Sequence, residues 1–121
     1  MKKKFFTDLK VGDKVYRLDV KTVTENGVEE LTADSVDIIN GCLVVKCGDK
    51  TLINWPISQL DECELIHDYD EDDNCVYYGT TRESVVSSFN RRIDSEIDYH
   101  ESEIKRFKGV IETLKLQKLP S

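Results

Sequence analysis

Four cysteines and two histidines are the residues of this 121-residue chain whose types best suit metal binding. The cysteines are Cys42, Cys47, Cys63 and Cys75, and His67 lies between the last two. No CxxC zinc knuckle is present, and an odd separation of Cys42 from Cys47 would point them to opposite faces of a strand. The spacing favours free thiols that pack as small hydrophobic side chains. We therefore expect no metal site and no cofactor.

An acidic segment is the second candidate, since residues 61–81 hold eight Asp and Glu and no Lys or Arg. Its carboxylates resemble the start of a calcium loop, but the sixth and twelfth positions, Asp73 and Gly79, lack the required Gly and Glu. A solvated turn is therefore the favoured interpretation. The alternative is a partner-binding acidic loop formed by Asp68, Asp70, Glu71, Asp72 and Asp73.

Catalytic motifs are missing from the sequence. It contains neither a glycine-rich phosphate loop nor a nucleophile elbow. The two histidines, His67 and His100, fall in different halves of the chain. The sequence therefore predicts a protein that is not an enzyme.

Residues 11–78 read as short strands separated by tight turns. Three dipeptides mark hairpin turns, because Gly and Asn tolerate positive φ: Asn26-Gly27, Asn40-Gly41 and Gly48-Asp49. The expected strands cover residues 15–23, 28–39, 42–47, 51–55 and 64–67, with an edge strand at 75–78. The third strand, 42–47, is apolar enough to be buried on both faces. Pro56 ends the fourth strand, and residues 57–60 form one helical turn.

This order of elements resembles the Src-homology-3-like barrel superfold over residues 9–67. Leu9-Lys10-Val11-Gly12-Asp13-Lys14-Val15 enters the first strand, and Trp55-Pro56-Ile57-Ser58-Gln59-Leu60 matches the helical turn before the last one. The resemblance implies a small, mostly antiparallel barrel. It implies no activity, because the loops that read proline-rich ligands in peptide-binding members are absent. The predicted fold class is α+β, a barrel followed by one long helix.

The helix is predicted from Arg82 to about Lys118, with Thr80 and Glu83 at the spacing of a capping box. Its apolar face is predicted to be a self-association surface of Val86, Phe89, Ile93, Ile97, His100, Ile104, Phe107, Ile111 and Leu114. From Ile97 onward the spacing is a heptad repeat, and the favoured interpretation of His100 is a partly buried polar residue that sets the register. The alternative is that titration of its imidazole makes association pH-sensitive. A continuous helix is favoured over a fold-back at Gly109.

Such a helix would be roughly 55 Å long, whereas a barrel of this size is only about 20–25 Å across. The barrel cannot cover the whole stripe, so we expect a homo-oligomer, with a dimer favoured. The sequence leaves the helix direction open. A parallel pair would place Glu103 near Lys108, which is favourable, but Glu96 near Glu101, which is not.

Composition sets the broader class. Hydrophobic residues make up 39% of the chain and charged residues 34%, with a formal net charge of −7. Neither a secretory signal nor a membrane-spanning stretch is evident, which predicts a cytoplasmic protein of bacterial or phage origin, in the host cytoplasm if phage-encoded. We expect a barrel domain over 1–79, with its acidic loop at 61–74, and a helix over 80–121.

Three functional hypotheses follow. The first is a non-enzymatic oligomeric scaffold, in which the helix self-associates and the barrel recognises a protein partner. The second is an acidic inhibitor whose loop imitates nucleic-acid phosphates and occupies a host protein. The third, a nucleic-acid or small-ligand binder, is disfavoured because clustered positive charge is sparse.

Overall fold

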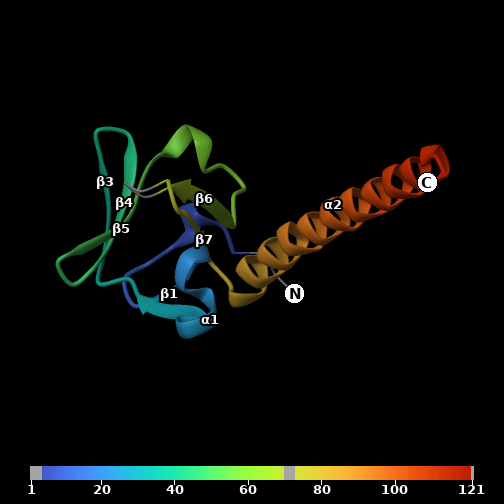
Figure 1. Cartoon of the computed structure of the whole chain (residues 1–121). Helices are drawn as coiled ribbons and strands as arrows, with labels where there is room; N and C mark the ends of the chain where they lie inside the picture. The colour runs from blue at the N-terminus through green and yellow to red at the C-terminus, as the bar shows by residue number, and fades with distance from the viewer. Residues whose placement is uncertain (1–3, 70–72, 121) are drawn as a thin grey trace. The chain divides into compact units, whose positions relative to one another are not determined.

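The computed structural model of this protein describes residues 4–69 and 73–120 (Figure 1). The chain divides into two compact units, Met1–Ser88 and Phe89–Ser121. Antiparallel strands make up the first unit, and a long helix that begins there runs through the second. The α+β class with a long C-terminal helix is therefore confirmed.

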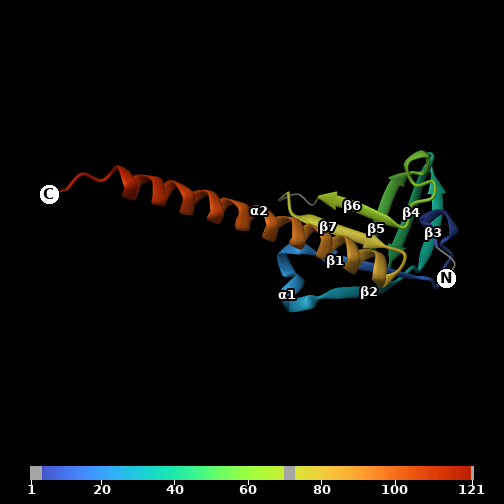
Figure 2. The ribbon, with the colours of Figure 1, turned by 90° about the vertical axis from the view of Figure 1, so that its right-hand side faces the viewer.

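One sheet has four antiparallel strands in the order β2-β1-β7-β6 (Figure 2). These strands are β1 (Lys14–Asp19), β2 (Val28–Thr32), β6 (Leu65–Tyr69) and β7 (Cys75–Gly79). The prediction of β7 as an edge strand was wrong, because β1 and β6 pair with its two edges. Cys75, Val76 and Tyr77 are buried in succession, as a central strand covered on both faces requires.

The second sheet has three antiparallel strands in the order β3-β4-β5. These strands are β3 (Ser35–Ile39), β4 (Cys42–Cys47) and β5 (Lys50–Pro56). Asn40 and Gly41 both have positive φ, 52° and 76°, which confirms the predicted two-residue turn between β3 and β4. Leu43, Val44 and Val45 are buried in succession, whereas Cys42 and Lys46, on the same face as Val44, are half-buried and exposed. The predicted burial of both faces of β4 therefore holds only for the middle of the strand.

The connection from β1 to β2 differs from the predicted hairpin at Asn26-Gly27. β1 ends at Asp19, and the chain then forms a 3₁₀ turn, η2 (Val20–Thr22), and a short helix, α1 (Val23–Asn26). The Asp19 side chain accepts a hydrogen bond from the Lys21 N–H at the start of η2. Gly27, with φ of 59°, ends α1 by donating its N–H to the Val23 carbonyl. The same positive φ that suits a hairpin turn also suits a helix C-terminus, so the dipeptide alone was ambiguous.

The single strand predicted over residues 28–39 is two strands that belong to different sheets. The break falls at Ala33, which exchanges backbone hydrogen bonds with Gly12 and Asp13. Asp34 then pairs with β4 through its N–H, and its carboxylate accepts the Gly48 N–H. Ala33 is fully buried, so the crossing point demands a small side chain.

The core of the first unit combines residues from both sheets with two short 3₁₀ turns, η1 (Phe6–Asp8) and η3 (Ile57–Gln59). η3 confirms the helical turn predicted after Pro56. The buried members are Phe6, Leu9, Val15, Ala33, Leu43, Val45, Leu52, Ile53, Leu60 and Ile66. The strands of the described residues form two separate sheets without closing into one barrel. The Src-homology-3-like resemblance stays a prediction.

Helix α2 spans Arg82–Gln117. The predicted N-cap at Thr80 would have made Thr81 the first helical residue, one position earlier. Thr81, rather than Thr80, accepts the N–H of Ser84, while the Thr80 hydroxyl donates to the Lys4 carbonyl. Val85 is fully buried beside Gly79, where an added Cβ would lie 2.5 Å from the Val85 side chain. The helix runs unbroken through Gly109, as predicted. Within the described residues, no helix combines the length and apolar character that crossing a membrane requires.

Candidate functional site

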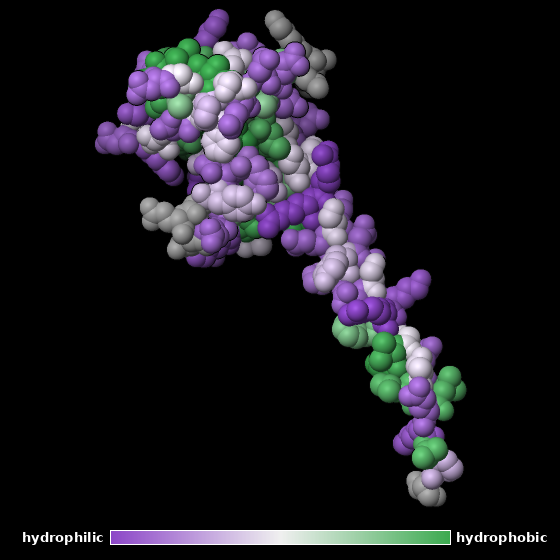
Figure 3. Space-filling view, turned by 90° about the horizontal axis from the view of Figure 1, so that it is seen from above, coloured by the Kyte–Doolittle hydropathy of each residue, from purple (hydrophilic) through white to green (hydrophobic). Residues whose placement is uncertain are grey.

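Exposed apolar side chains gather along the C-terminal half of α2 (Figure 3). We define the α2 stripe as Ile97, Ile104, Phe107, Ile111 and Leu114. Each of these side chains is between 47% and 59% exposed. Their heptad spacing places them in one row, as in the core positions of a coiled coil.

The α2 stripe also contains a surface hollow. It is bordered by Ile111, Leu114, Lys115 and Lys118, with Gln117 beside them. Ile111, Leu114 and Lys115 are spaced i, i+3 and i+4 on α2, as three of the four residues around a coiled-coil hole are, and Lys118 follows the end of the helix. The geometry can therefore accept an apolar side chain from another helix.

The remaining residues of the predicted self-association surface lie in two environments. Val86, Phe89 and Ile93 are half-buried, in contrast to the exposed stripe that follows. His100 is exposed, and its ring meets the Tyr99 ring edge-on at 5.4 Å between centroids. Sequence reasoning missed Val110, which is 50% exposed next to the stripe, although its position beside Ile111 could have indicated it.

Charged residues flank the α2 stripe. Glu103 pairs with Arg106 at 3.1 Å, and Glu96 pairs with Arg92 at 3.5 Å, both along the helix surface. Glu101 and Lys108, by contrast, have no hydrogen-bond or ion-pair partner within the described residues. These two charges are therefore available to an external partner.

The predicted thiols and histidine meet at one place only within the described residues. His67 Nε2 contacts Cys75 Sγ across the β6–β7 pair, and the His67 ring stacks on Tyr77 at 4.6 Å. All four cysteines are free, and no third Cys, His, Asp or Glu joins a metal-binding group in the part of the chain that the structure describes. Cys75 is buried, which makes the thiol a poor nucleophile toward external molecules.

The two cysteines of β4 lie on opposite faces of the strand, as predicted. Cys47 packs against the core, whereas Cys42 lines a shallow surface groove of about 400 Å³ with Val44 and Asn54. Sequence reasoning did not find this groove, because it is assembled from three strands. Ile39 of edge strand β3 also lines the groove and is 50% exposed.

The predicted acidic loop is described only at its ends. Asp68 and Asp73 are exposed, and Asp73 adopts a positive φ of 57°. Asp70, Glu71 and Asp72 lie outside the described residues. The partner-binding role of this loop stays a prediction.

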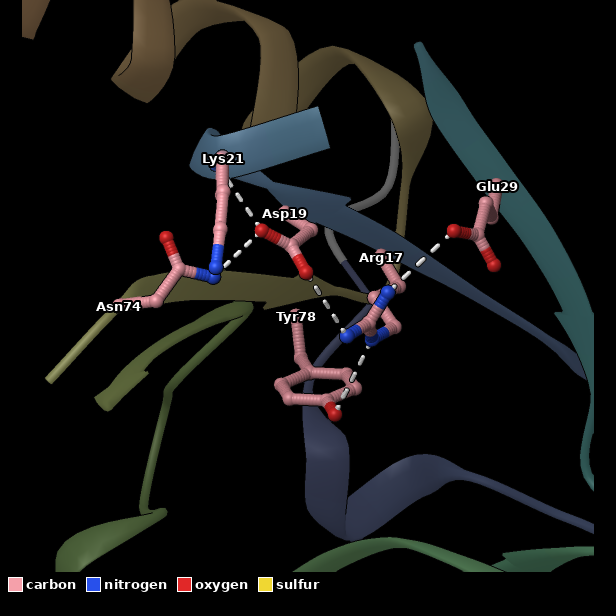
Figure 4. Close-up of polar contacts among 6 residues, drawn as sticks. All are labelled: Arg17, Asp19, Lys21, Glu29, Asn74 and Tyr78. Carbon is pink, nitrogen blue, oxygen red and sulfur yellow. Dashed lines mark hydrogen bonds and ion pairs between the residues drawn. The ribbon is translucent and has the colours of Figure 1, made fainter. Parts of the chain in front are cut away.

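A polar network joins β1 to strands β2 and β7 (Figure 4). Arg17 forms ion pairs with Glu29 at 3.3 Å and with Asp19 at 3.4 Å, and it donates a hydrogen bond to the Tyr78 hydroxyl. Burial lowers the pKa of Arg17, but Tyr78 and the two carboxylates outweigh it, so the pKa is raised. The hydrogen bond from Asn74, despite partial burial, lowers the pKa of Asp19. The positive charge of Arg17 is thus balanced by the carboxylates of Asp19 and Glu29, and the network links neighbouring strands of the sheet.

Comparison with known proteins gives no match. No protein-family model, curated protein sequence or solved structure is significantly similar to this chain. Function must therefore be argued from the surface of the molecule itself.

Proposed function

We propose that this protein is a non-enzymatic binding module that self-associates through the α2 stripe. The observation that carries the proposal is the exposure of the five stripe residues, about half of each side chain, in a single heptad row. Residues 97–120 of the second unit include no buried residue. An uncovered helix is only marginally stable in water, and pairing would stabilise it.

The energetic gain from pairing is large enough to drive association. Full burial of an Ile, Leu or Phe side chain is worth roughly 1.5–3 kcal/mol, and about half of each stripe residue remains to be covered. Ten such side chains in a dimer contribute about 8–15 kcal/mol, against an association cost of roughly 4–15 kcal/mol. Because the two terms are similar, we expect a reversible, concentration-dependent dimer.

The experiment is light scattering of the full chain and of the double variant Ile104→Asp/Ile111→Asp. Wild type should exceed one chain per particle at roughly tens of micromolar, where a complex of moderate affinity is populated. The double variant should be monomeric and keep the strand signal in circular dichroism, because both residues are exposed and lie outside the first unit. A monomeric wild type would contradict the proposal.

The role of the first unit in this proposal is recognition of a protein partner, whose identity the chain does not specify. The groove and the exposed Ile39 that lines it support a binding role for that sheet. No observation on the described residues favours the acidic-inhibitor or nucleic-acid hypotheses over this one.

A further inference from the structure

The charges beside the α2 stripe indicate the direction of the second copy; this inference rests on the self-association proposed above. In the heptad that starts at Ile97, position e is next to the stripe on one side and position g on the other. The e flank consists of Asp94, Glu101, Lys108 and Lys115. The g flank has two charged residues, Glu96 and Glu103.

The two flanks differ in whether their charged residues form ion pairs within the chain. Glu96 and Glu103 of the g flank are paired within the chain, with Arg92 and Arg106. Glu101 and Lys108 of the e flank have no such partner within the described residues. In an antiparallel pair the e flanks of both copies meet, whereas in a parallel pair each e flank meets a g flank.

We propose that the second copy binds antiparallel, with Ile104 of one chain level with Phe107 of the other. This register keeps an apolar side chain opposite every residue of the stripe except Ile111, which faces His100. No His100 therefore lies opposite another His100. The outer layer pairs Ile97 with Leu114, so Ile97 enters the hollow bordered by Ile111 and Leu114.

On the e flank, this register alternates opposite charges. Glu101 lies two residues, about 3 Å along the axis, from Lys108 of the second copy, and Asp94 lies equally close to Lys115. Both pairs occur twice because the dimer is symmetric. The closest like charges are Lys108 and its own copy on the e flank and Glu103 and its own copy on the g flank, each five residues or about 7.5 Å apart along the axis.

In a parallel pair, like charges would be neighbours more often than opposite charges. There Glu101 would lie between Glu96 and Glu103 of the second copy, and Asp94 would lie beside Glu96. Glu103 with Lys108 would be the one adjacent pair of opposite charge. His100 would also face its own copy in the core. The charges therefore favour the antiparallel direction.

The helix boundary agrees with this register. Asp94 is level with Gln117 of the second copy, and Gln117 is the last residue of α2. The paired segment, residues 94–117, thus uses α2 to its end. It also lies entirely within the second compact unit, so it requires no residue of the first.

The test is the dimer dissociation constant of Glu101→Lys, measured by sedimentation equilibrium at low salt. In the antiparallel dimer the introduced ammonium group would lie near Lys108 of the second copy, and the dissociation constant should rise roughly five- to thirtyfold. In a parallel dimer the same substitution would place a cation between Glu96 and Glu103 and would tighten binding. The two directions therefore predict opposite signs.

A matched control and a second variant complete the experiment. Glu112→Lys makes the same charge change at an exposed position away from both flanks and should leave the dissociation constant unchanged. Adding Lys108→Glu to Glu101→Lys should restore wild-type affinity. Tighter binding by Glu101→Lys, or no difference from Glu112→Lys, would overturn the antiparallel assignment and leave self-association standing. A wild type that never dimerises would overturn both proposals.

Discussion

Replacing Ile104 by Ala should weaken the dimer by a predictable amount. The Ile104 side chain is 54% exposed in the single chain, so a second copy would cover about half of it. Removing that contact should cost roughly 1–1.5 kcal/mol per chain, from the value of burying apolar area. Two copies lose about 2–3 kcal/mol, which raises the dissociation constant about 30- to 150-fold.

Sedimentation equilibrium over a concentration series measures this change. The matched control is Leu116→Ala, which removes similar apolar area from a side chain that is 88% exposed off the stripe. We expect the control to change the dissociation constant by less than about twofold. Ala favours helix more than Ile does, so weaker pairing by Ile104→Ala could not be attributed to loss of helix. Equal effects of the two substitutions would refute the assignment of this face.

Two further predictions concern the helix and the sheet. Gly109→Ala should raise helix stability by about 0.5–1 kcal/mol, because Ala favours helix more than Gly does and the added Cβ would meet no atom within 4 Å. Amide exchange around residue 109 should become slower, and faster exchange would contradict the prediction. The pKa of Asp19 is lowered in the folded chain from its ordinary value of 3.8. The ionised carboxylate therefore stabilises the fold at pH values above 3.8, and this stabilisation is lost as the pH falls through the lowered pKa. Asp19→Asn should therefore lower the urea midpoint at pH 7 and flatten its fall between about pH 5 and 2, whereas an unchanged pH slope would argue against this role.

The sequence predicted the elements that are specified by a local pattern, such as a repeated apolar spacing or a turn dipeptide. The apolar spacing from Val86 to Leu114 indicated one helix, and α2 is continuous from Arg82 to Gln117. Turn chemistry identified the Asn40-Gly41 hairpin, because both residues must take positive φ there. These features depend on neighbours in sequence, so the sequence alone was informative.

Features that depend on distant segments were not predictable in the same way. The central place of β7 follows from its pairing with β1, almost sixty residues earlier in the chain. The break at Ala33 arises where two sheets meet, and nothing local marks it except a small side chain. Val85, rather than Val86, is the buried residue of the first helical turn, because it packs beside Gly79.

For the candidate site, too, the sequence predicted what depends on local spacing but not what depends on side-chain contacts. The stripe was predicted from its heptad spacing, and the structure places all five of its residues at the surface. The sequence could not separate paired from unpaired flank charges, since Glu103 can reach several cations. The ion pair with Arg106 made that distinction, on which the proposed helix direction depends.

Hydrogen exchange of the wild-type chain at two protein concentrations tests self-association through α2 most directly. At roughly 1 µM the monomer should dominate, and amides of residues 97–117 should exchange quickly. At about 100 µM the same amides should be strongly protected, while those of the buried strand β4 remain unchanged. Protection of residues 97–117 that does not vary with concentration would contradict the account.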